Sequence, residues 1–430
     1  MRKSTLGLCV FAALVGDMAF AQNAVVDTLN RFTASGPQRE TARAVGVLCP
    51  AGNRLTPRLQ NDCNSLVGAA FQNIANVATA LRQVTADNAT IPIDRSGLGK
   101  FTPIRVPGSP AGLGWGALMT DEDEVALALN SDGENSWSAY AQLRFDSDER
   151  KPSINEDGFD RDARGLTLGA DRRFGANLYV GGALSLHRSD SDYTDNSGSL
   201  DADDTAFHLY SGWQNDAGFH LDGLLGLTRS DISQVRKVGY TLGTTVVDQG
   251  YDSGFDSEER LLALTAGFRF NRDALNLNPY LRIEAIDAST DAYTERSRAP
   301  DANGAGWALS VGELDENFTR LSAGLRAAFV ISGETGVYQP FLDIAWISVS
   351  GLDAQAANVR FAGDLSTNVS QSPLQFLLAA DEEDDGYGSV ALGVSAQWAN
   401  GFAGFAGLRQ NVGDDRLDTR QIDLGLRYEF

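Results

Sequence analysis

The last twelve residues, 419–430, read TRQIDLGLRYEF and carry the clearest indication of the fold class. Ile422, Leu424, Leu426, Tyr428 and Phe430 alternate with polar residues or glycine up to the carboxylate. Alternation with a period of two is the pattern of a β-strand that has one apolar and one polar face. In an outer-membrane barrel the apolar face meets lipid, the polar face meets the lumen, and the last strand closes on the first. The stretch therefore predicts a membrane-spanning strand.

The same alternation recurs from Trp137 onward and predicts about twelve antiparallel strands. The eleventh, 402–410, is rich in Gly and Ala on both faces, so its register is ambiguous. The predicted connections alternate in length. Short ones fall at 175–177, 215–218, 271–275, 333–336 and 400–401, and long ones at 146–161, 189–203, 230–255, 289–316 and 350–387. Short turns on one rim and long loops on the other are typical of outer-membrane barrels, and a soluble β-sandwich has no reason for this segregation.

The beginning of the chain has the features of a secretory signal. Arg2 and Lys3 precede an apolar run at 6–15, and Ala19 and Ala21 are the small residues expected before a cleavage site. We expect residues 1–21 to be a signal peptide. Lipidation at Cys9 is disfavoured, because the apolar run has not yet ended there.

Charge and cysteine usage restrict the partners. The formal net charge of −22 at pH 7 disfavours nucleic acid, whose phosphates require a basic face. Once Cys9 is removed with the signal, Cys49 and Cys63 remain, and such a pair in an exported chain predicts a disulfide. A disulfide that closes a loop of this length contributes about 3 kcal/mol. No histidine lies near the pair, so we expect no metal there.

The region ahead of the barrel predicts a small stapled helical module at 22–90. An amphipathic segment at 25–32 precedes the loop between Cys49 and Cys63, and a helix at 64–86 follows it. A Pro/Gly-rich and acidic linker is predicted at 91–136, and the barrel at 137–430. The module could be a plug or lid at the barrel mouth, a short external passenger, or a periplasmic domain.

Few residues suggest catalysis. Hydrolase, metalloprotease and nucleotide-binding motifs are missing from the sequence. His187, His208 and His220 fall on predicted lumen-facing registers, with His187 and His208 near the long-loop rim and His220 near the opposite one. One of them could act with Ser185 and Asp222 in a hydrolase. A wet lumen accepts such residues without catalysis, so we predict no enzyme and no cofactor.

Charged residues are predicted in two places. A mixed-charge lumen is predicted from Arg144, Asp171, Glu284, Arg326, Asp343, Arg409 and Arg427. Acidic long loops are predicted from Asp190, Asp192, Asp195, Asp201, Asp203 and Asp204, and from Asp381, Glu382, Glu383, Asp384 and Asp385. We favour solvated loops, with divalent cations that bridge to lipopolysaccharide phosphates as the alternative.

Residues 137–430 resemble the translocator β-domain of bacterial autotransporters. The resemblance implies a twelve-stranded outer-membrane barrel with extracellular long loops, and an N-terminal passenger that leads into the lumen. It also implies that the barrel-assembly machinery reads Ile422, Leu424, Leu426, Tyr428 and Phe430, and that the barrel contacts outer-membrane lipid and lipopolysaccharide.

Two features depart from the pattern of that family. Only 22–136 is available as a passenger, without repeats, and no helix is predicted directly before the first strand. We expect a barrel that anchors, and has translocated, a short passenger or plug. An adhesin that uses the acidic loops, or a small porin, is the alternative.

Overall fold

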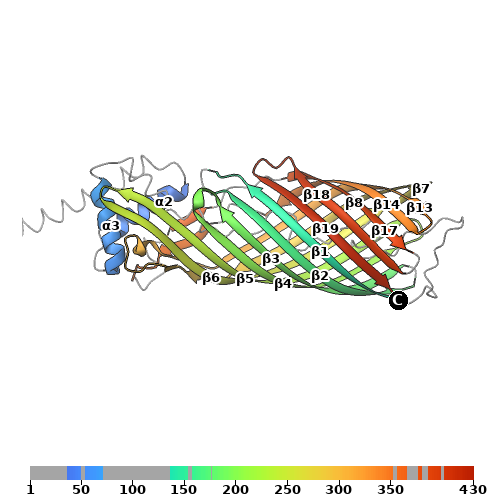
Figure 1. Cartoon of the computed structure of the whole chain (residues 1–430), viewed down its shortest axis with the longest axis horizontal. Helices are drawn as coiled ribbons and strands as arrows, with labels where there is room; N and C mark the ends of the chain where they lie inside the picture. Colours follow the sequence, from blue (N-terminus) through green and yellow to red (C-terminus); the bar gives the residue numbers. More distant parts are fainter. Residues whose placement is uncertain are drawn as a thin grey trace, which may run out of the picture.

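The computed structural model (Figure 1) describes residues 36–49, 54–70, 136–153, 157–175, 177–351, 356–365, 376–379, 386–398 and 401–430. Most of them form a closed barrel of 12 antiparallel strands, which confirms the predicted fold class. The strands are β1 (Trp137–Arg150), β2 (Phe159–Phe174), β3 (Leu178–Tyr193), β4 (Gly198–Gln214), β5 (Phe219–Leu242), β6 (Thr245–Phe268), β8 (Leu275–Thr290), β12 (Leu314–Phe329), β14 (Gly336–Ser350), β17 (Gly386–Trp398), β18 (Phe402–Val412) and β19 (Leu417–Glu429).

The terminal strand closes the barrel as its sequence predicts. β19 pairs with β1 along its whole length, and β6 pairs with β8 on the other side of the long hairpin. The backbone N–H groups of Trp137 and Phe430 each donate to the other residue's carbonyl, at 3.1 and 2.8 Å. Closure of this kind leaves the barrel without the unpaired sheet edge that lipid cannot solvate.

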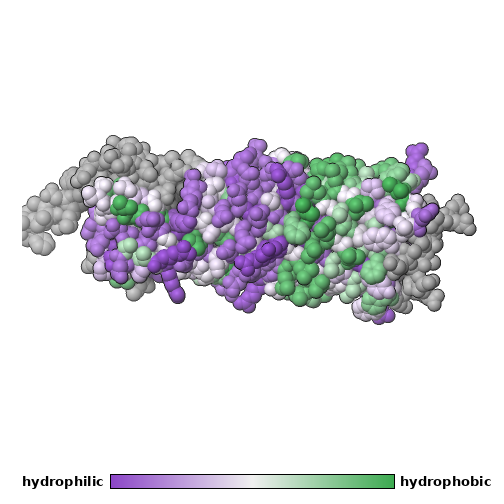
Figure 2. All heavy atoms as spheres, in the orientation of Figure 1, coloured by the Kyte–Doolittle hydropathy of each residue, from purple (hydrophilic) through white to green (hydrophobic). Residues whose placement is uncertain are grey.

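Side chains alternate between the lipid face and the lumen as predicted. Leu424 and Leu426 of β19 are 41% and 55% exposed on the outside, whereas Asp423, directly before Leu424, is fully buried in the lumen. Figure 2 shows that the outward apolar residues form a belt over the part of the barrel near the short turns. Exposed aromatic rings border the belt at the short-turn rim: Trp137, Phe174, Trp213, Phe219, Phe402, Tyr428 and Phe430. Such girdles mark a membrane–water interface.

The strands continue far beyond the apolar belt, which corrects two predicted loops. β5 and β6 have 24 residues each, whereas a membrane-crossing strand needs about 9–11. Residues 230–255, predicted as a loop, are strand except for a turn at 243–244, and 189–203 is likewise mostly strand. The outward-facing residues of these strand extensions are polar because they lie outside the membrane and face water, and their polarity makes the segments resemble loops in sequence. On the inner face of the same extension, apolar side chains are buried, among them Ile232, Val238 and Tyr240.

Rings and glycines pair across neighbouring strands inside the barrel. Tyr140 lies over Gly169 and Phe405 over Gly425, each in the directly paired position, so that an added Cβ would overlap the ring. The Phe405–Gly425 pair establishes the register of the eleventh strand, which the sequence left ambiguous: Phe405 faces inward while Leu408 faces lipid. Further pairs are Tyr210 with Gly181, Tyr179 with Gly212, Tyr280 with Gly324, and Phe341 with Gly393.

Smaller elements gather at the long-loop end (Figure 1). They are the helices α2 (Gly36–Leu48) and α3 (Pro57–Ala70), a 3-10 turn η3 (Ala305–Trp307), and a second sheet of β9 (Tyr293–Thr294), β11 (Leu309–Val311), β15 (Ala356–Phe361) and β16 (Phe376–Ala379). Of the shorter pieces, η2 (Thr194–Asn196) and β10 (Arg296–Ser297) belong to the long-loop side, whereas β7 (Phe270–Arg272) and β13 (Ile331–Gly333) lie at the short-turn rim (Figure 1). Neither α2 nor α3 is long and apolar enough to span a bilayer.

The helices differ from the predicted ones. α3 begins at Pro57, seven residues before the predicted start at Asn64, because Thr56 caps it: its Oγ accepts a hydrogen bond of 3.4 Å from the Leu59 amide. Proline at the first helical position is favourable, since it lacks an N–H that would be unsatisfied. α2 was not predicted. The signal peptide, the 25–32 segment, residues 71–86 of the predicted helix and the linker up to 135 lie outside the described residues.

Candidate functional site: the docked N-terminal module and the lumen

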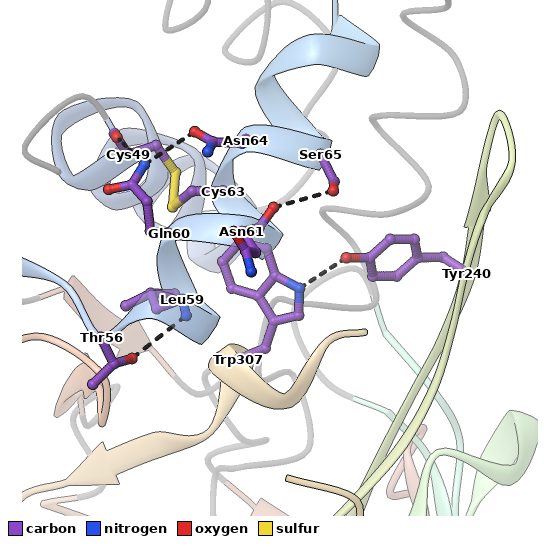
Figure 3. The surroundings of a disulfide bond; sticks show 10 residues. All are labelled: Cys49, Thr56, Leu59, Gln60, Asn61, Cys63, Asn64, Ser65, Tyr240 and Trp307. Carbon is purple, nitrogen blue, oxygen red and sulfur yellow. Dashed lines mark hydrogen bonds between the residues drawn. A yellow bond between two sulfur atoms is a disulfide. The ribbon is translucent and has the colours of Figure 1, made fainter. Parts of the chain in front are cut away.

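The disulfide predicted between Cys49 and Cys63 is present and joins α2 to α3 (Figure 3). The two Cα atoms are 5.1 Å apart, and both side chains are buried. Gln60 of α3 donates a hydrogen bond of 3.2 Å to the Cys49 carbonyl beside the bridge. We define the N-terminal module as α2, α3 and this disulfide. Its apolar side chains belong to the same buried cluster as Trp307 and Tyr240 of the barrel's long-loop end.

Asp62 of α3 holds the backbone of the 291–313 loop. One carboxylate oxygen accepts the Gly304 amide and the other accepts the Gly306 amide, each at 2.8 Å. Burial raises the pKa of Asp62, whereas the two amide donors and Arg58 lower it. Arg58 also forms an ion pair of 2.6 Å with Asp301 at the surface.

Glycine is required where α3 meets η3. A Cβ at Gly306 would overlap the Leu59 backbone, and one at Gly363 would lie 2.7 Å from the Thr56 hydroxyl. The chain before α3 is also bonded to the loop before β16: the Thr56 amide donates to the Gly363 carbonyl at 2.9 Å, and the Leu365 amide to the Arg54 carbonyl at 2.8 Å. The helix thus sits in backbone contact with two loops that follow different barrel strands.

Trp307 and Arg236 connect these loops to the long β5–β6 hairpin. Trp307 is fully buried, and its Nε1 donates to the Tyr240 hydroxyl at 2.8 Å (Figure 3). Arg236 makes two hydrogen bonds to Glu295, at 2.7 and 2.6 Å, and a third to the Trp307 carbonyl at 2.8 Å. A bidentate buried pair of this kind fixes the geometry of the loop strongly.

The lumen contains the mixed charges predicted for it. Arg427 donates to Asp171 and to Ser138, and Arg144 pairs with Asp423 at 3.1 Å. The other predicted lumen residues face inward as well. Glu284 pairs with Arg282 and Arg320, Arg326 approaches Asp343, and Arg409 donates to Ser389. Arg282 and Arg320 were not singled out from the sequence, although their inward registers could have identified them.

The candidate catalytic residues face the lumen, but His187, Ser185 and Asp222 form hydrogen bonds with residues outside the candidate set. His187 lies between Asp204, at 3.1 Å, and Asp146, at 3.6 Å. The Ser185 hydroxyl bonds the Thr167 hydroxyl at 2.8 Å, and Asp222 accepts a long hydrogen bond of 3.4 Å from Tyr179. The registers place His220 near the short-turn rim, as predicted.

The first group of acidic residues does not form a loop. Only Asp195 lies in a turn; Asp190, Asp192, Asp201 and Asp203 point outward from β3 and β4, and Asp204 points inward. Within the described ranges no three metal-ligating side chains are grouped to hold an ion. The second acidic group, 381–385, lies outside those ranges.

The residues of the predicted assembly signal, Ile422, Leu424, Leu426, Tyr428 and Phe430, all face outward on or beside the closing strand. Recognition of them by the assembly machinery stays a prediction.

The family model for the autotransporter beta-domain matches residues 125–409. The chain belongs to the autotransporter β-domain family. Barrels of this family lie in the bacterial outer membrane, which places this barrel there. The match stops within β18, and the structure shows that β19 completes the autotransporter barrel.

Solved translocators have similar folds. The translocator domain of autotransporter NalP from Neisseria meningitidis is 16% identical, with a TM-score of 0.51 over 68% of this chain and 88% of that one. The β-domain of the Bordetella autotransporter BrkA is 20% identical, with a TM-score of 0.46 over 69% and 100%. The transport unit of AIDA-I from Escherichia coli is 13% identical, with a TM-score of 0.39 over 73% and 94%. A search of curated proteins found no similar sequence.

Proposed function

We propose that this barrel exports its own N-terminal module to the cell exterior and keeps it there as a cap docked on the long loops. The observation that carries the proposal is the position of α3, which rests at the long-loop end, while β1 starts at the short-turn rim. The described residues on either side of 71–135 thus lie at opposite rims of the barrel. In the proposed orientation the long loops are extracellular and the short turns periplasmic.

Retention is supported by the character of the docking contacts. The Asp62 carboxylate, the fully buried Trp307 and the close approach of Leu59 to Gly306 all join the module to loops of the same chain. A passenger meant for release would not need such specific backbone contacts. Anchoring and export by this route require no chemical reaction and no cofactor.

The test is the accessibility of a tag placed after Gln22. We expect protease added to intact cells to remove the tag, while heat-modifiable gel mobility shows a folded barrel. A matched tag in the short turn at 215–218 should be protected, because that turn lies at the opposite rim. Protection of the first tag in cells with a folded barrel would contradict export, and would favour a periplasmic module or a plugged pore.

A further inference from the structure

A groove of about 480 Å³ lies on the outer face of the barrel, where β1 to β4 pass the edge of the apolar belt. Its lower part is apolar and continuous with the belt. Its upper part is polar and contains two guanidinium groups. The apolar lining residues are Leu143, Phe145, Leu166 and Leu186, and the polar ones include Arg164, Arg188, Asp203 and Thr205.

The two arginines occupy directly paired positions. Arg164 of β2 is opposite Arg188 of β3, and both point outward, next to the last apolar outward residues of their strands, Leu166 and Leu186. Like charges directly opposite each other on neighbouring strands are destabilising. An anion bound between them would remove this repulsion.

The two guanidinium groups differ in their contacts within the protein. Arg164 makes no ion pair or side-chain hydrogen bond with any residue that the structure describes. Arg188 approaches Asp190 at 3.6 Å and Asp203 at 3.7 Å, but all three side chains are at least half exposed. Exposed pairs at such distances contribute little. Asp203 would compete with a bound anion for Arg188, whereas Arg164 has no ion pair with a competing carboxylate among the described residues.

A second outer groove shows which feature is specific. This groove, of about 660 Å³, is formed mainly by β4, β5, β6, β8 and β12, and also combines apolar residues with an arginine, Arg260. There the cross-strand neighbour of Arg260 is Asp287, so the charges are balanced. Of these two grooves, the one at Arg164 and Arg188 presents a pair of cations above an apolar channel.

We propose that this groove binds a phosphorylated lipid of the outer leaflet. The phosphate lies between Arg164 and Arg188, and an acyl chain lies along Leu143, Phe145, Leu166 and Leu186. Guanidinium groups match phosphate oxygens in a bidentate geometry, and the apolar channel opens directly onto the hydrocarbon region. The lipid class is a phosphorylated glycolipid, since the proposed extracellular orientation places the groove in the outer leaflet; in this respect the inference rests on the proposed function.

The test uses the purified full chain in detergent, incubated with bisphosphorylated hexa-acyl lipid A and examined by native mass spectrometry. We expect one retained lipid, and about tenfold weaker retention for each guanidinium removed in Arg164→Gln and Arg188→Gln. Arg188→Lys keeps the charge but loses the bidentate geometry, and should give an intermediate loss. Arg260→Gln in the charge-balanced groove is the matched control and should retain the lipid. Heat-modifiable mobility confirms that each variant is folded.

Three further results decide the identity of the ligand. The wild type should bind dephosphorylated lipid A no better than the double variant, Arg164→Gln with Arg188→Gln, binds it. Millimolar inorganic phosphate alone should not displace the phosphorylated lipid from the wild type. Equal retention by the wild type and by Arg164→Gln with Arg188→Gln would overturn the proposal, as would equal binding of the dephosphorylated lipid. Displacement by phosphate would show a simple anion site and also overturn it. Because binding in detergent does not depend on membrane orientation, its failure is distinguishable from a failure of the tag experiment.

Discussion

The Trp307 indole donates a hydrogen bond of 2.8 Å to the Tyr240 hydroxyl, and this contact joins the loop under α3 to the hairpin that projects from the barrel. Tyr240 belongs to β5, so the docking platform is an extension of the barrel wall itself. The N-terminal module therefore rests on a platform that includes the β5–β6 hairpin.

Gly306→Ala should loosen the module without unfolding the barrel. The new Cβ would overlap the Leu59 backbone, which cannot move aside cheaply, and overpacking of this kind costs about 1–3 kcal/mol. Limited proteolysis of α3 should accelerate while heat-modifiable mobility stays unchanged. Gly239→Ala is the control, because a Cβ there meets nothing within 4 Å. Equal proteolysis of the two variants would show that α3 is not held at Gly306.

Cys49→Ser with Cys63→Ser should destabilise the module selectively. The bridge closes a segment with a sequence separation of 14, and its loss should cost about 3 kcal/mol through the entropy of the unfolded chain. The denaturant midpoint of the α2–α3 transition, followed by hydrogen exchange, should fall, and that of the barrel should not. The same shift after reduction of the wild type would confirm the cause; an unchanged midpoint would mean that the docking contacts alone hold the helices.

Asp62 should make docking weaker as pH rises. Because burial raises its pKa above the ordinary value of about 3.9, the docked state binds this proton more tightly than the undocked state. Docking stability is then highest below the ordinary pKa, and it declines as pH rises from there through the raised value. Hydrogen-exchange protection of α3 between pH 4 and 7, corrected for intrinsic rates, measures the decline.

Asp62→Asn isolates this contribution, since the amide does not titrate. The variant should lose the part of the pH dependence that belongs to Asp62. It should also dock more weakly by about 1–3 kcal/mol, because one of the two backbone amides loses its acceptor. A pH profile identical to that of the wild type would rule out Asp62 as the titrating group.

Gly425→Ala should impair barrel assembly, and Phe405→Ala should partly rescue it. The ring of Phe405 covers Gly425 on the paired strand, so the added methyl group has no space until the ring is removed. The folded fraction on a heat-modifiable gel gives the result. Gly223→Ala, whose Cβ would meet its nearest neighbour at an ordinary 3.7 Å, serves as the control. No rescue by Phe405→Ala would mean that the defect has another origin.

The barrel was predictable to a large degree because its signal is local. Leu424 and Asp423 differ in polarity for the same reason that they face lipid and lumen, and each strand repeats this signal independently. The prediction failed at 230–255, where the strand continues but its surroundings change. Outside the membrane the polar face meets water, so the pattern that marks a lipid-facing strand ends before the strand does.

In the candidate site, the sequence predicted the disulfide and the mixed-charge lumen but not the docking contacts of the N-terminal module. The N-cap pair Thr56 and Pro57 was a local signal for the start of α3 that could have been used. By contrast, no spacing in the sequence connects Asp62 with Gly304 and Gly306, which lie more than two hundred residues away. The paired arginines at positions 164 and 188 became visible only with the strand register.

A membrane barrel of about twelve strands, its terminal closing strand and its N-terminal disulfide could all be predicted from the sequence, because periodicity and cysteine spacing are properties of short segments. The docking of the N-terminal module at the long-loop end, and the pairing of two arginines above an apolar groove, became known only from the folded chain. Those contacts join distant segments, and their stability comes from close packing and from burial of paired polar groups that no single segment encodes.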